Sequence, residues 1–84
     1  MSRLAAEQGG MNAQSNLGVK YTNGEGVPRD MMLAYMWFDI AAAQGHEGAQ
    51  RTRGRVRGLM TPAQITESQR LSREWLEAHP PGGN

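Results

Sequence analysis

A short internal repeat is the feature that most restricts what this chain can fold into. An Ala-Glu-Gln-Gly sequence near the N-terminus returns as Ala-Ala-Gln-Gly in the middle of the chain, and an alanine–glutamine pair follows each copy. Gln8 matches Gln44 and Ala13 matches Ala49, which gives one offset (44 − 8 = 49 − 13 = 36). A period of this length, with glycine between helical stretches, is typical of helix–turn–helix repeats that stack into a solenoid.

Local signals divide the chain into helices of one all-α domain over residues 1–79. We expect the end of a preceding repeat helix at about 1–8, a full repeat at 11–45, a degenerate repeat helix at 47–58, a capping helix at 61–78 and a disordered tail at 80–84. Asp30 is a favourable N-cap for the second helix of the full repeat. Thr61, Pro62 and Gln64 fit a capping box at the start of the last helix.

The apolar stripe changes between the two copies of the repeat. Ala13, Leu17 and Tyr21 recur every four residues, which predicts one buried face on the first helix. At the offset of 36, arginines replace that leucine and tyrosine, and we expect a rotated stripe of Ala49, Thr52, Val56 and Leu59. The second copy is therefore degenerate, and we expect the last helix to cap it.

Two further patterns concern helix packing. Gly18 lies inside a helix, where glycine costs about 1 kcal/mol relative to alanine, so we expect it to permit close approach of a neighbouring helix. On the last helix, Arg70 with Glu74 and Arg73 with Glu77 are spaced to form ion pairs.

Taken together, these residues resemble the Sel-1-like repeat, a relative of the tetratricopeptide repeat. The likeness covers about residues 5–50 and includes the turn Gly-x-Gly-Val-x-x-Asp. The positions that agree are Leu17, Gly18, Tyr21, Gly24, Gly26, Val27, Asp30, Ala34, Trp37, Phe38, Ala41, Ala42, Gly45 and Ala49. The segment from Met60 to Trp75 is similar to the closing helix of bacterial members.

The resemblance implies a fragment of an α/α solenoid, built from antiparallel helix pairs with a C-terminal capping helix, that holds a partner on its concave face. In related repeats the first helix of each pair lines this groove. The matching positions here are Asn12, Ser15, Val19 and Thr22, with Arg51 and Arg55 in the next repeat. Arginine can hold a carboxylate with two hydrogen bonds, so we expect an acidic peptide or protein as partner.

Each candidate surface has a purely structural alternative. Arg51, Arg53, Arg55 and Arg57 form two ridges of a helix, and their long stems can simply shield the edge of the core. A second contact surface consists of Met31, Met32 and Leu33, which can instead pack on the last helix. We interpret the aromatic residues as core.

The composition excludes several classes of function. There is no cysteine, the formal net charge is +1, and the two histidines have no second ligand at helical spacing, so we expect no metal, no cofactor and no enzymatic activity. The near-neutral charge argues against nucleic acid, and no apolar run is long enough to cross a membrane. We expect a cytoplasmic protein, or a periplasmic one if a signal lies upstream.

Two functions stay open after this reading. The first is a non-catalytic adaptor that binds a protein or peptide. The second is a structural end-cap or self-association unit of a longer repeat scaffold. Because repeat arrays usually need about three units for stability, we expect the N-terminal face to be masked by self-association or by further repeats.

Overall fold

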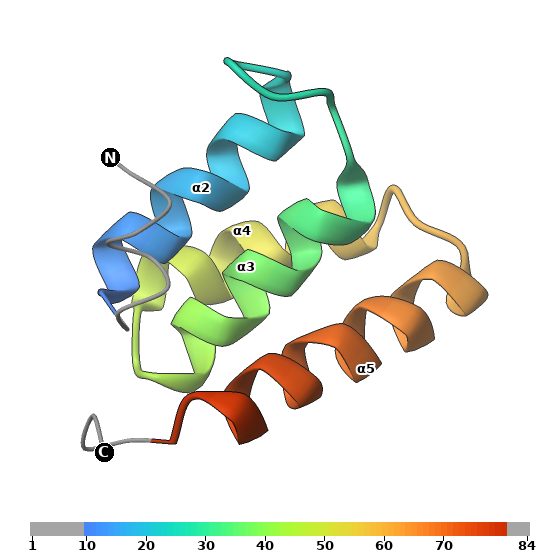
Figure 1. Ribbon diagram of the computed structural model, residues 1–84. Coiled ribbons are helices and arrows are strands. Elements are labelled where there is room, and N and C mark those ends of the chain that lie inside the picture. The colour runs from blue at the N-terminus through green and yellow to red at the C-terminus, as the bar shows by residue number, and fades with distance from the viewer. Residues whose placement is uncertain (1–9, 81–84) are drawn as a thin grey trace.

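The computed structural model describes residues 10–80 of the chain. Within that range it contains four helices and no strand (Figure 1): α2 (Met11–Asn23), α3 (Met31–Ala43), α4 (Glu47–Arg57) and α5 (Pro62–Ala78). The all-α prediction is confirmed. The expectations for residues 1–8 and 81–84 lie outside the described residues.

The predicted caps form as hydrogen bonds. Asp30 Oδ1 accepts the backbone N–H groups of Met32 and Leu33 at 3.0 and 3.1 Å, which begins α3. At the start of α5, the Gln64 N–H donates to Thr61 Oγ1 at 3.1 Å, and the Thr61 N–H donates to Gln64 Oε1 at 2.9 Å. Each cap satisfies backbone donors that have no partner inside the helix, so these two boundaries are fixed by local sequence.

The α2–α3 hairpin is packed around a glycine. A Cβ atom at Gly18 would lie 2.9 Å from each of three atoms of the Phe38 ring, so only glycine permits this approach. The expectation of a close helix contact at Gly18 is confirmed. The core residues buried around this contact are Ala13, Leu17, Tyr21, Ala34, Tyr35, Met36, Trp37, Phe38, Ile40, Ala41, Ala42, Ala49 and Val56.

Helix α3 is the centre of the molecule, and α5 packs on it instead of on α4. Figure 1 shows α3 with α2 and α4 on one side and α5 on the other, and α4 and α5 barely contact each other. We expected the last helix to cap the degenerate repeat, and α5 makes its main helix contacts with α3.

The rotated stripe of α4 is confirmed only in part. Ala49 and Val56 are buried, and Thr52 is half-buried. The prediction was wrong for Leu59, whose exposed fraction is 70%. Helix α4 ends at Arg57, so the helical period that would carry Leu59 inward no longer applies.

Candidate interaction surfaces

The residues expected in the groove lie on two neighbouring helices. On α2, Asn12 and Val19 are exposed, whereas Ser15 and Thr22 are half-buried. The Thr22 hydroxyl donates to the Gly18 carbonyl at 2.8 Å, which leaves the oxygen free only as an acceptor. Helix α2 also contacts α4, so both helices contribute to one side of the molecule. The first helix of the groove is therefore mostly polar and neutral.

The four arginines of α4 do not form two equivalent ridges. Arg51, Arg55 and Arg57 are exposed, and none of them forms an ion pair with another residue of the range 10–80. Arg53 differs, because its Nη1 lies 2.7 Å from Asp39 Oδ1 on α3. Arg51 and Arg55 therefore keep their guanidinium groups available on the expected surface, while Arg53 belongs to the packing of the molecule.

The alternative methionine surface is largely part of the core edge. Met31, Met32 and Leu33 are all half-buried, and the first and last of them pack against the core. The backbone oxygen of Met32 accepts a hydrogen bond from Ser68 Oγ of α5 at 3.1 Å. These contacts favour the packing interpretation over a free contact surface.

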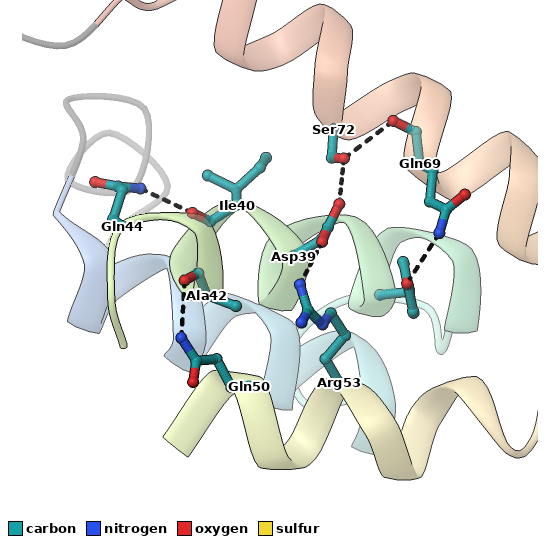
Figure 2. Close-up of polar contacts among 9 residues, drawn as sticks. Asp39, Ile40, Ala42, Gln44, Gln50, Arg53, Gln69 and Ser72 are labelled. Carbon is teal, nitrogen blue, oxygen red and sulfur yellow. Dashed lines mark hydrogen bonds and ion pairs between the residues drawn. The ribbon is translucent and has the colours of Figure 1, made fainter. Parts of the chain in front are cut away.

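A polar network that the sequence did not reveal joins three helices. Asp39 is the only charged residue of α3, and its carboxylate binds Arg53 of α4 through Oδ1 and Ser72 of α5 through Oδ2 (Figure 2). The Ser72 hydroxyl donates to Oδ2 at 2.5 Å and is itself buried. Nearby, Gln69 Nε2 of α5 donates to the Tyr35 hydroxyl at 3.4 Å. The only available signal was one carboxylate on an otherwise apolar helix.

Glutamine amides also connect successive helices. Gln44 Nε2, beyond the end of α3, donates to Gln14 Oε1 of α2 at 2.6 Å and to the Ile40 carbonyl at 3.1 Å. One repeat later, Gln50 Nε2 of α4 donates to the Ala42 carbonyl at 3.2 Å. Gln14 is fully buried, whereas Gln50, its counterpart one repeat later, is exposed.

Both histidines have structural roles. His46 caps α4, since its Nδ1 accepts the Ala49 N–H at 3.0 Å. The ring of His79 stacks on Trp75 with centroids 4.0 Å apart, and Trp75 meets Trp37 edge-on at 5.6 Å. Residues 10–80 hold no group of three side chains that could bind a metal ion. None of the described helices has the length and apolar character needed to span a bilayer.

Comparisons with family models and solved structures show which proteins this chain resembles. Residues 12–46 match the family model of the Sel1 repeat. Among solved structures, the crystal structure of a protective antigen present in uropathogenic Escherichia coli strains, which displays an SLR fold, is similar with a TM-score of 0.90 and 34% identity. The match covers 96% of this chain and 18% of that antigen, so the chain spans less than a fifth of its length. No match was found among curated proteins.

Proposed function

Because the chain carries a Sel1 repeat at residues 12–46 and has the SLR fold, we propose that it is a non-catalytic module that binds an acidic protein or peptide on the α2–α4 face. Sel1 repeats are typically protein–protein interaction modules. The partner and the place of binding are the parts that this proposal adds.

Two exposed arginines that form no ion pair within residues 10–80 carry the proposal. Arg51 and Arg55 lie one helical turn apart on α4, are exposed, and have no acidic partner among residues 10–80. Residues four apart on a helix point the same way, so an extended acidic segment can reach both guanidinium groups. Each group can hold one carboxylate with two parallel hydrogen bonds. The neutral α2 side of the surface, with Asn12 and Val19, offers no competing carboxylate.

A charge reversal with a matched control tests this. We would select peptides from a displayed random library on the wild type and then measure their affinity for Arg51→Glu/Arg55→Glu. The control, Arg57→Glu/Arg73→Glu, makes the same charge change at two other exposed positions. We expect acidic peptides to be enriched and to lose at least about tenfold in affinity only with the first variant. Equal loss with both variants, in proteins of unchanged helicity, would refute a site at Arg51 and Arg55.

The outer face of α5 supports the second candidate, a structural end-cap. Arg70 pairs there with both Glu67 and Glu74, so this face is charged and polar. Terminal units of repeat arrays need a polar outer face for solubility. As an end-cap, the chain would select no peptide, and the charge reversals on α4 would change only its assembly or stability.

A further inference from the structure

Helix α4 carries a glycine that the fold does not use. Gly54 follows Gly18 by the repeat offset of 36 residues (54 − 18 = 36). On α2, Gly18 is covered by the Phe38 ring, three atoms of which lie 2.9 Å from the position of a Cβ. At Gly54, which is exposed, no atom of residues 10–80 beyond its chain neighbours and the backbone of its own helix comes within 4 Å of that position. The same glycine site therefore occurs twice and is covered by a ring only once.

The position of α5 explains why no ring of this chain lies there. The residue that follows Phe38 by 36 is Glu74, which pairs with Arg70 on the outer face of α5. Helix α5 packs on α3 and barely contacts α4. Among residues 10–80, the face of α4 around Gly54 is therefore left without a partner helix.

Nothing local requires glycine at this position. Positive φ angles occur only at Gly24, Gly26 and Gly45 in the described range, so alanine could adopt the backbone conformation of Gly54. Glycine inside a helix is destabilising relative to alanine. The loss of stability at Gly54 therefore has no compensating contact within residues 10–80.

The charges beside Gly54 indicate what could cover it. Arg51 precedes it by three residues, on the neighbouring position of the same helix face, and Arg55 adjoins it. We propose that α4 binds a partner segment whose aromatic ring lies flat on Gly54 and whose carboxylates bind Arg51 and Arg55. This inference rests on the proposed function and specifies the chemistry of its partner.

The Gly18–Phe38 contact within this chain shows why an aromatic ring is expected to bind at Gly54. Without a Cβ, the backbone at glycine is flat enough for the face of a ring, whereas a methyl group at Gly18 would overlap the ring. A flat aromatic side chain gains contact over its whole face, and a branched aliphatic one touches at fewer atoms. We therefore expect phenylalanine, tyrosine or tryptophan at the central position, with aspartate or glutamate on both sides.

A peptide array separates the ring from the charges. The probes are ten-residue acidic peptides that differ only at one central position, which is phenylalanine, tyrosine, tryptophan, leucine or alanine. We expect the wild type to bind the aromatic members about tenfold more tightly than the alanine member. Gly54→Ala should abolish this preference, because the new methyl group occupies the place of the ring. The same variant should raise the melting temperature of the free protein by about 4 °C, because alanine favours the helix more than glycine does. The control Thr66→Ala, at an exposed position of α5, should keep the preference.

The outcomes distinguish this inference from the proposed function. If the wild type binds acidic peptides without any preference for aromatic members, and Arg51→Glu/Arg55→Glu abolishes that binding, the ring site is overturned. The proposal of an acidic partner would still hold. A preference that survives in a folded Gly54→Ala protein would overturn the ring site as well. If no acidic peptide binds the wild type, both proposals fail.

Discussion

At the scale of single residues, Gly18 sets the distance between α2 and α3. Phe38, whose ring lies over it, is 1% exposed and has little room to move. In Gly18→Ala the new methyl group would stand 2.9 Å from three ring atoms. Overpacking of a core costs about 1–3 kcal/mol, and the better helix propensity of alanine returns about 1 kcal/mol.

We therefore expect Gly18→Ala to lower the free energy of unfolding by about 1 kcal/mol, measured by urea denaturation. Gly54→Ala is the matched control, since its Cβ meets no described residue and the same substitution should stabilise the protein. Equal effects of the two substitutions would mean that the Phe38 ring moves aside at little cost.

Individual residues also show which contacts could be predicted from the sequence alone. The caps at Asp30 and Thr61 were predictable because donor and acceptor lie within three residues of each other. The bonds of Asp39 were not, because Arg53 and Ser72 are 14 and 33 residues away and no local pattern pairs them. Arg51 and Arg55 belong to no apolar stripe and are exposed, and their binding role stays a prediction.

At the scale of elements, the ion pairs on the outer face of α5 affect the ionisation of Glu67. Arg70 forms ion pairs with Glu67 and Glu74, whereas within the described chain the expected pair of Arg73 with Glu77 does not form. The hydrogen bond from Arg70, with a smaller contribution from its charge, holds the pKa of Glu67 below its ordinary value, although desolvation opposes this. We expect Arg70→Gln to raise the pKa of Glu67, measured by NMR titration of its carboxyl carbon.

The sign of the stability effect follows from that direction. A carboxyl group whose pKa is depressed in the folded state stabilises the protein above its unfolded pKa, and loses this effect as the pH falls through its folded pKa. The advantage of wild type over Arg70→Gln should therefore be present at neutral pH and vanish in acid. Because the pair is exposed, added salt should also reduce it. An unchanged Glu67 pKa in the variant would show that the pair does not persist in solution.

The placement of α5 could not be read from its own pattern. Its apolar face, with Ile65, Leu71 and Trp75, predicts one buried side, but a stripe does not specify which helix it meets. The contacts that do fix α5 on α3 join Ser68 to Met32 and Ser72 to Asp39, which lie 36 and 33 residues apart, and no local pattern pairs residues at such distances.

At the scale of the whole molecule, stability is distributed unevenly around α3. The chain is small, with a radius of gyration of 11.7 Å, and α3 contributes most of the buried hydrophobic side chains of the described residues. The α2–α3 contact is apolar and tightly packed, as the Phe38 ring shows. On α5, the only buried residues are Ser68 and Ser72, each bound to α3 by a hydrogen bond. Its apolar residues are half-buried.

Local opening of α5 should therefore precede global unfolding. Regions with few buried apolar contacts open at lower free energy than the core, and amide hydrogen exchange detects this directly. We expect the α5 amides to exchange faster than those of α2 and α3 under native conditions. Ser72→Ala removes the bond to Asp39 and keeps Arg53 paired, so it should speed exchange in α5 by about tenfold and leave α2 unchanged. If the amides of all four helices instead exchange at one rate, and Ser72→Ala changes all four rates equally, the molecule opens as a single unit. The half-buried face of α5 would then hold its helix in the fold as firmly as the Gly18–Phe38 contact holds α2.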